Sequence, residues 1–562
     1  MSTVRSSSES SLLLWSILAA FALTILFVNP LRETAIGDDW GFALTVQRLL
    51  ETGSYQLHEY AAMNMPFQVY WGAMFAHVFG YSHSSLRVST LVLVCFGLVA
   101  FYYLTREHHV DHPQAGLLTL ALMGSPLLLY HSFTFMTDVP FLMCLIIALY
   151  FYTRAIRLES YPWMVLASIA ASAAILTRQF GVAVTAGVFF VWVLGSDRWG
   201  KSFFFMTGLM LPALAGFWQF GAARTPNWTA RLLMYNQAVY FAHLGPLLGE
   251  ILWRPTVILQ YLALFTLPFV LLALPAWVIE RKRAGQSDGS PGLKLSIFVP
   301  GLLAFYILAG IIYGRFIKQL PWLLPYLAWD DTLASMDRLP RGIVTLITSA
   351  GAVLYACMFI LRYARGWTRL PRSEQLLDLV GLFLFIQQLA FYKIGDRYLL
   401  VLLPVVLILL GRHLRGWLGR YRVAMAVALV VMLIGSAMWT RGVLAAAEAT
   451  WQGAELVRAT GVEPARIYGS AEWNSYYGGA FEEWLSQIGD PKLENQLDFW
   501  RRYLPERRER AEFLVLREMP VHQQGEVVAV VPYRDSFFRE KQIYVLRKMS
   551  GAPMANGRVV RD

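Results

Sequence analysis

The sequence predicts an all-α polytopic membrane protein that carries a small α/β domain at its C-terminal end. Of the 562 residues, 57% are hydrophobic and 15% are charged, whereas about a quarter are charged in a typical soluble domain. The mean hydropathy is +0.47. Apolar runs close to 20 residues, the length that crosses a bilayer as a helix, recur along the chain. These features exclude an ordinary soluble enzyme.

We expect about thirteen transmembrane helices within a domain at residues 12–440, after a cytoplasmic tail at residues 1–11. The first run is too long for a typical signal peptide and lacks a small-residue cleavage site, so we interpret it as a retained helix. A long polar and aromatic outer loop at residues 31–85 follows it. The expected spans are 12–29, 86–104, 114–131, 139–153, 163–177, 181–195, 202–220, 256–279, 295–313, 342–361, 376–392, 399–411 and 423–440.

Every second connection between these runs is short and basic, which is typical of cytoplasmic loops. These connections hold Arg154 and Arg157, Arg198 and Lys201, Arg281–Arg283, Arg362–Arg372 and Arg412–Arg422. The N-terminus is then cytoplasmic, and an odd number of spans places the C-terminal tail outside the plasma (inner) membrane. The net charge of +11 is explained by these loops and does not call for nucleic acid.

The C-terminal tail, residues 441–562, is more charged than the rest of the chain. Short alternating stretches at 466–469, 513–516, 527–531 and 542–546 predict strands, and the region 481–510 predicts helices. We therefore expect a small extracytoplasmic α/β domain.

Asp38 and Asp39 form an acidic pair just after the first apolar run and just before Trp40. Carboxylates beside a bilayer are costly and tend to be kept where they do work or find partners. Such a carboxylate could accept a proton from an acceptor hydroxyl or amine, or bind a divalent cation. The alternative is a helix N-cap with an acidic first turn, and residue chemistry alone does not decide between the two.

Two other polar sites lie at the outer ends of expected helices. Asp138 precedes Pro140, which suits the first turn of a helix, so N-capping is again the alternative. Arg397 could hold a phosphate or carboxylate through its planar fork, and Tyr398 could add a hydroxyl donor. The alternative for these two is interfacial anchoring and snorkelling.

Arg178 and Gln179 depart from the charge pattern, because they lie at the outer end of the fifth expected helix. Asp38, Asp138 and Asp396 fall on the same expected face. The chain has no phosphate-cradling glycine loop, no Walker-type lysine and no serine nucleophile elbow. A nucleotide-driven pump and a cytosolic nucleotide-sugar enzyme are therefore disfavoured.

The order of these motifs resembles the start and end of GT-C glycosyltransferases, in particular the protein O-mannosyltransferase and aminoarabinose-transferase group. The resemblance covers roughly residues 10–440. It is carried by the acidic pair, then by 66–71 (PFQVYW), 79–82 (FGYS), Arg87, Thr137–Pro140 as the second outer-loop acid, and Asp396–Pro404 as the late Arg/Tyr-Leu-Pro segment.

The resemblance implies a polyprenyl-phosphate sugar as donor and a lipid, glycan or protein acceptor that attacks with inversion. Asp38 would be the catalytic base or the group that orients the acceptor. The other implied catalytic acids are Asp39 and Asp138, and the implied phosphate-binding residues are Arg397, Tyr398 and Arg178. We also expect Trp40, Gln179 and Asp396 in the substrate cavity. A divalent cation at Asp38 and Asp138 stays open.

The chain departs from the family pattern at two positions. Relatives often have Lys where Met65 stands, and Glu where Asp39 stands. The first departure removes a phosphate contact, which Arg178 or Arg397 would have to replace.

Two alternatives belong to other functional classes. A transporter or lipid flippase would place ionisable groups at mid-membrane within broken helices, whereas the charges noted here lie at helix ends on one face. A protein in which only the outer domain acts in envelope assembly would not need so many spans as an anchor. An integral membrane glycosyltransferase is therefore the leading hypothesis.

Overall fold

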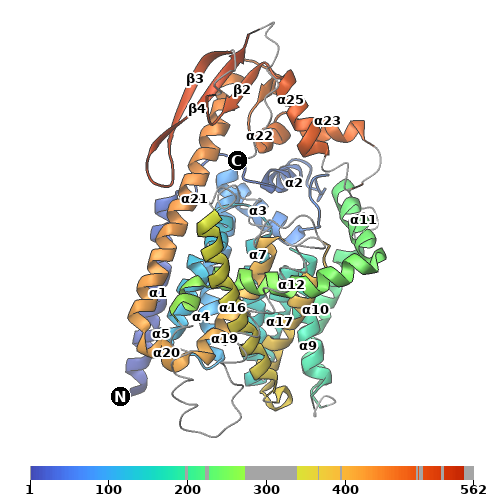
Figure 1. Ribbon diagram of the computed structural model, residues 1–562. Helices are drawn as coiled ribbons and strands as arrows, with labels where there is room; N and C mark the ends of the chain where they lie inside the picture. Colours follow the sequence, from blue (N-terminus) through green and yellow to red (C-terminus); the bar gives the residue numbers. More distant parts are fainter. Residues whose placement is uncertain are drawn as a thin grey trace.

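The structure is a computed structural model that describes most of the chain. The described residues are 2–195, 200–221, 227–272, 338–364, 366–392, 395–488, 492, 498–519 and 525–549. Helices form an elongated bundle, and a small sheet lies at one end of it (Figure 1). This arrangement confirms the predicted fold class. The expected span 295–313 and the basic loop Arg281–Arg283 lie outside the described residues.

Four described helices are long and apolar enough to cross a membrane. They are α4 (His83–Glu107), α7 (Asp138–Leu158), α10 (Ser202–Gly221) and α21 (Arg422–Arg458). The number rises to five if α5 (His112–Gly124) and α6 (Pro126–Ser132), which meet at 64°, form one span. The chain is thus a multi-pass membrane protein, and the expected count of thirteen stays a prediction.

Other helices complete the bundle. They are α1 (Ser2–Val28), α8 (Tyr161–Ile175), η1 (Gln179–Gly181), α9 (Val182–Val193), α16 (Arg338–Ala364), η4 (Trp367–Arg369), α17 (Arg372–Ala390), α18 (Asp396–Leu399), η5 (Leu400–Leu402), α19 (Leu403–His413) and α20 (Arg415–Arg420). The basic helix α20 lies at the end of the bundle away from the sheet (Figure 1). One continuous apolar core joins most of these helices.

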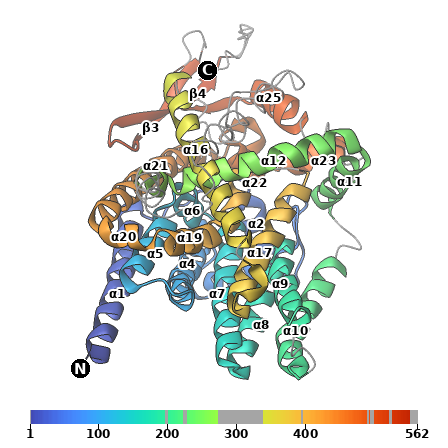
Figure 2. The same ribbon diagram turned by 60° about the horizontal axis from the view of Figure 1, so that its bottom comes forward.

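The region after α10 differs from the expected long loop. It forms α11 (Trp228–Ala242) and α12 (Leu244–Phe265), so a helix begins at residue 244, before the expected start of the span at residue 256. Arg254 interrupts the apolar pattern, but it is buried and donates to the backbone carbonyls of Leu389 (3.1 Å) and Tyr392 (3.1 Å). Carbonyls at the end of a helix lack partners within the helix, so they can accept from a buried guanidinium. α12 runs across the neighbouring helices in both views (Figure 1, Figure 2).

The sheet confirms the four predicted strands. Its order is β1-β2-β4-β3, with β1 parallel to β2 and the other pairs antiparallel. The strands are β1 (Ile467–Tyr468), β2 (Phe513–Leu516), β3 (Gly525–Arg534) and β4 (Glu540–Lys548). α21 continues unbroken from the bundle into the C-terminal domain and packs on the sheet at Gly453, where a Cβ would lie 3.0 Å from Val515. The expected domain boundary at residue 441 therefore falls inside a helix.

The C-terminal domain also contains short helices, some of which contact the first outer loop. They are η6 (Pro464–Arg466), α22 (Ala471–Tyr476), α23 (Ala480–Gln487), the π-helical turn η7 (Phe499–Tyr503) and α25 (Leu504–Arg510). Trp228 packs on Trp484 with ring centroids 5.1 Å apart, and Trp40 packs on Phe481 at 6.1 Å. These aromatic contacts form one core with the sheet and hold the domain over the outer loop.

The first outer loop lies between the bundle and the C-terminal domain and contains α2 (Asp39–Thr52) and α3 (Pro66–Phe79) (Figure 1). Arg87 fixes its beginning. This buried side chain donates to the carbonyls of Pro30 (2.9 Å), Arg32 (2.8 Å) and Thr34 (2.9 Å). A buried guanidinium needs hydrogen-bond acceptors, and these three carbonyls supply them. The contacts fix the position of the segment that leads to the acidic pair.

Candidate active site

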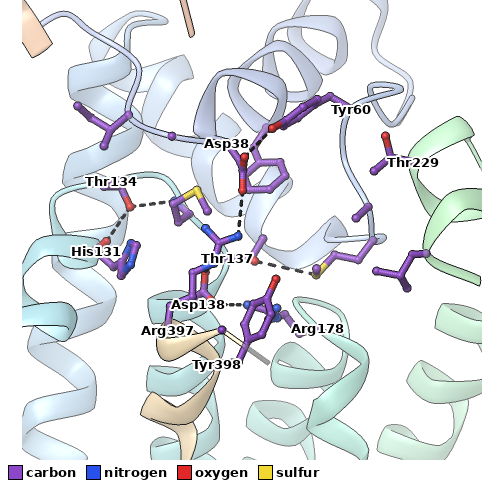
Figure 3. A pocket seen from close by; sticks show the side chains of 18 of the residues that line it. Asp38, Tyr60, His131, Thr134, Thr137, Asp138, Arg178, Thr229, Arg397 and Tyr398 are labelled. Carbon is purple, nitrogen blue, oxygen red and sulfur yellow. Dashed lines mark hydrogen bonds and ion pairs between the residues drawn. The ribbon is translucent and has the colours of Figure 1, made fainter. Parts of the chain in front are cut away.

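A cavity of about 510 Å³ lies where the bundle, the first outer loop and the C-terminal domain meet. Its lining combines opposite charges with aromatic rings, which is typical of sites that bind polar ligands in a fixed orientation. The polar and aromatic residues that concern us in the lining are Asp38, Trp40, Tyr60, His131, Thr134, Thr137, Asp138, Arg178, Asp396, Arg397, Tyr398, Glu472 and Trp500. Figure 3 shows most of them pointing toward one another.

Asp38 is held by tertiary contacts and not by a helix cap. Gly37 adopts a left-handed φ of +57°, which glycine permits at little cost, and the chain then enters α2. Asp38 occupies the N-cap position, but its side chain makes no capping hydrogen bond. Its carboxylate accepts from the Tyr60 hydroxyl (2.6 Å) and from Nη2 of Arg397 (2.9 Å), as Figure 3 shows. The capping alternative is therefore not what occurs at Asp38.

Asp138 and Arg178 form a buried ion pair beside Asp38. Their side chains are 4% and 6% exposed. Asp138 is the first residue of α7, and Arg178 is an extended residue just before η1. Nε of Arg397 lies 3.9 Å from Oδ2 of Asp138, so Arg397 approaches both acids of the cavity. Two guanidinium groups thus face two carboxylates at the ends of helices.

Tyr398 and Asp396 support these arginines. The Tyr398 ring centroid lies 4.8 Å from Cζ of Arg178 and 5.4 Å from Cζ of Arg397, a cation–π distance in both cases. Oδ1 of the buried Asp396 accepts from the backbone amide of Arg397 at 2.6 Å. Gln179 is half-buried in η1 and is not part of the lining.

The remaining predicted residues divide between the lining and the protein interior. Trp40 lines the cavity and packs on the Tyr60 ring at 4.4 Å. Met65, the position at which the resemblance leads us to expect a lysine, is fully buried and does not line the cavity. Among the lining residues that the structure describes, the arginines available to an anion are Arg178 and Arg397.

Asp39 does not line the cavity, although the resemblance implied that it is a catalytic acid like Asp38. Its side chain is 1% exposed, and its two oxygens accept from the backbone amides of Ile36 (2.7 Å) and Phe135 (3.2 Å). Burial raises the pKa of Asp39 to about 7, although the charge of Arg87 and the two amides act in the opposite direction. Asp39 therefore ties the first outer loop to the segment between α6 and α7.

Sequence reasoning missed Tyr60, His131 and Glu472. Tyr60 and Glu472 lie in segments without a recognisable motif, and no signal in the sequence singles them out. His131 is buried near the end of α6. A signal for it existed, because the break in the apolar run after α6 was visible from the sequence.

The charges of the cavity bear on the question of a metal. Among the residues that the structure describes, no three His, Cys, Asp or Glu side chains gather as a metal site. Asp38 and Asp138 are each paired with an arginine. A divalent cation at these two acids would have to displace guanidinium groups, so the residues present fit an anion held by arginines better than a cation.

A family model for dolichyl-phosphate-mannose-protein mannosyltransferase matches residues 64–220. This match confirms the predicted resemblance to the protein O-mannosyltransferase group over that part of the chain. It includes Asp138 and Arg178, whereas Asp38 and Arg397 lie outside it. No curated protein matches the chain.

Solved structures of two other proteins are similar at low sequence identity. ArnT from Cupriavidus metallidurans in the apo state is 15% identical, with 95% of this chain and 97% of that chain covered and a TM-score of 0.42. The structure of the same protein bound to undecaprenyl phosphate is 14% identical, with 96% of this chain and 99% of that chain covered and a TM-score of 0.40. The second protein is the archaeal oligosaccharyltransferase AglB from Archaeoglobus fulgidus, in complex with an inhibitory peptide and a dolichol-phosphate. It is 15% identical, with 84% of this chain and 60% of that chain covered and a TM-score of 0.42.

Proposed function

We propose that this chain is an integral membrane glycosyltransferase that transfers a sugar from a polyprenyl-phosphate donor to an acceptor, with inversion at the anomeric carbon. The observation that carries the proposal is the contact between Asp38 and Arg397, whose side chains are 33% and 27% exposed at one cavity. A carboxylate base beside a cation suits a reaction that takes a proton from the acceptor and releases an anionic phosphate. The family model over residues 64–220 supports this class of donor.

Donor binding would change the partners of Arg397. In the free protein, Arg397 donates to Asp38. An incoming phosphate diester would compete for the same guanidinium, because arginine forms strong bidentate hydrogen bonds with phosphate. Asp38 would then lose a hydrogen-bond donor that stabilises its charged form and become a stronger base. The base would thus be activated only when a donor is present.

The transfer step follows from this arrangement. A hydroxyl oxygen or amine nitrogen of the acceptor attacks the anomeric carbon from the face opposite the phosphate. The new bond forms as the bond to the phosphate oxygen breaks, and its electron pair leaves with the phosphate. Asp38 takes the acceptor proton, while Tyr60 holds the other carboxylate oxygen at 2.6 Å. Arg397 and Arg178 stabilise the charge on the departing phosphate.

The arrangement favours transfer on the outer face of the plasma (inner) membrane. The cavity lies beneath the C-terminal domain, and the basic helix α20 lies at the other end of the bundle (Figure 1). With basic segments inside, the N-terminus is cytoplasmic. The transporter alternative has less support, because Asp138 begins α7 and Arg397 lies in the short α18, so both charges are at helix ends.

Replacement of Asp38 by asparagine tests the proposal. We expect the rate of transfer to fall at least about 100-fold, which is the contribution that a general base typically makes to the rate. Protein abundance and melting temperature should be unchanged. The assay is mass analysis of envelope lipids, glycans and glycoproteins from a deletion strain complemented with each variant. Asp111→Asn is the matched control, because Asp111 lies at the surface and pairs with Arg415. Near wild-type glycosylation with Asp38→Asn would show that the catalytic assignment is wrong.

A further inference from the structure

The C-terminal domain contributes two cavity residues that the donor chemistry does not use. Glu472 is the second residue of α22, and Trp500 lies in η7. The charge of Glu472 acts on Asp38 and Tyr60, the residues that would receive the acceptor. Glu472 therefore belongs to the acceptor side of the cavity.

Glu472 can accept hydrogen bonds from a ligand. It forms no ion pair with any residue in the described part of the chain, and it is half-buried. Burial raises the pKa of Glu472; hydrogen bonds from its own backbone and from Ser470 and the charge of Arg517 act in the opposite direction, and the charge of Asp38 adds a smaller increase. An ionised carboxylate has about four acceptor positions, so these contacts leave room for a ligand donor that replaces lost water.

Trp500 adds an apolar surface to the same cavity. Its side chain is 41% exposed, and the ring of Phe499 supports it at 5.1 Å. Indole offers a rigid apolar face at little entropic cost. A carboxylate and an exposed indole that line one cavity suit a sugar ring, whose hydroxyls donate and whose C–H face is apolar. A phosphate would be repelled by Glu472 and attracted by Arg178 and Arg397.

We propose that Glu472 and Trp500 form an acceptor subsite for a carbohydrate, so that the acceptor is a glycan or a glycan-bearing molecule. This inference rests on the proposed function for the neighbouring donor site. The subsite has a fixed position, because the domain is anchored to the first outer loop. His58 Nε2 lies 2.7 Å from Glu482 Oε1, and the Tyr81 and Tyr476 hydroxyls are 3.1 Å apart.

The experiment measures two probes on the purified full-length protein in detergent micelles. A lipid-free oligosaccharide fraction, released from the cell envelope by mild acid, reports on the subsite through saturation-transfer NMR. Undecaprenyl phosphate reports on the donor site through native mass spectrometry. We expect Glu472→Gln to weaken oligosaccharide binding about tenfold, because it removes one hydrogen bond to a charged group. Trp500→Ala should weaken it by a similar factor of about ten, because it removes the apolar face that the sugar ring would cover. Undecaprenyl phosphate affinity should change by less than about twofold.

Controls come from the same domain. Glu506→Gln removes an exposed glutamate of α25, and Phe537→Ala removes an exposed aromatic ring. Neither should affect either probe. Glu472→Asp keeps the charge and should retain part of the oligosaccharide signal, which a folding defect would not allow. Melting temperatures of all variants complete the control.

The outcomes separate the two proposals. If the wild-type protein binds undecaprenyl phosphate, and Glu472→Gln and Trp500→Ala bind the oligosaccharide like wild type, the subsite is wrong and the proposed function stands. Absence of oligosaccharide binding to the wild type, or a loss confined to undecaprenyl phosphate in the variants, also overturns the subsite. If the wild type does not bind undecaprenyl phosphate, it is the proposed function that fails.

Discussion

Replacing Arg397 by alanine should weaken use of the donor and leave use of the acceptor almost unchanged. In the structure Arg397 donates to Asp38 at 2.9 Å and approaches Asp138 at 3.9 Å. Asp138 keeps Arg178 as its partner when Arg397 is removed. The alanine variant therefore removes one of the two cations that could bind the phosphate, without leaving a buried acid unpaired.

The magnitude follows from the contacts that are lost. A hydrogen bond to a charged group contributes about 1.5–3 kcal/mol, which corresponds to roughly a 10- to 150-fold change in an equilibrium constant. We expect the dissociation constant of undecaprenyl phosphate to rise by about this factor. Arg397→Lys should recover part of the affinity, because it restores the charge but not the planar fork.

Asp38→Asn should have the opposite effect on the same probe. It removes the carboxylate that competes for Arg397, and partly exposed ion pairs are worth up to about 1 kcal/mol, so undecaprenyl phosphate should bind up to about fivefold more tightly. Tighter binding combined with lost transfer is a signature that a folding defect cannot produce.

The assay combines native mass spectrometry of undecaprenyl phosphate with transfer kinetics at varied donor and acceptor concentrations. The matched control is Arg415→Ala, which removes a surface arginine paired with Asp111. It should leave both measurements within about twofold of wild type. If Arg397→Ala changes only the KM for the acceptor, the reasoning is refuted and Arg397 does not hold the donor phosphate.

Three further substitutions test the surroundings of the site. Asp138→Asn leaves Arg178 buried without its counter-ion and should destabilise the protein by about 3–5 kcal/mol; an unchanged melting temperature would contradict this. Tyr60→Phe removes the hydroxyl that orients the Asp38 carboxylate, so turnover should fall about tenfold; the charged form of Asp38 also loses a hydrogen bond, so the acid limb of the pH–rate profile should move to higher pH, and an unchanged profile would argue against Asp38 as the base. Burial raises the pKa of Asp39 from 3.8 to about 7, so its carboxyl favours the folded state below about pH 4 and this contribution is lost as the pH rises to about 7. Melting curves should therefore decline over this range in wild type and less steeply in Asp39→Asn, and parallel curves would count against the shifted pKa.

Much of the fold follows from the sequence, because the hydropathy of a segment and the periodic spacing of its apolar residues are local properties. The long apolar runs became α4, α7, α10 and α21, and the alternating stretches became the four strands. The boundary errors occur where local pattern and tertiary contact disagree. Arg254 interrupts an apolar run but donates hydrogen bonds to carbonyls at the end of α17, so α12 begins earlier than its hydropathy indicates.

The alternation of basic loops also predicts which candidate site residues share a face of the membrane. It assigns each helix end to one side, and this argument places Asp38, Asp138, Arg178 and Arg397 together. All four line one cavity. The argument works because helices that cross a membrane bring their ends to one of only two surfaces.

The role of each acid depends on packing between segments that are far apart in the chain. Asp38 and Asp39 are adjacent, but successive residues at a helix start point about 100° apart, so one faces the cavity and the other binds backbone amides. Arg397, which donates to Asp38, is 359 residues away from it in the chain. Glu472 comes from a domain whose position no local pattern specifies. Local hydropathy and loop charge are thus enough to predict the membrane fold and the side on which the charges gather. The side-chain pairings are not encoded locally, because the contacts that make them exist only after the chain has packed.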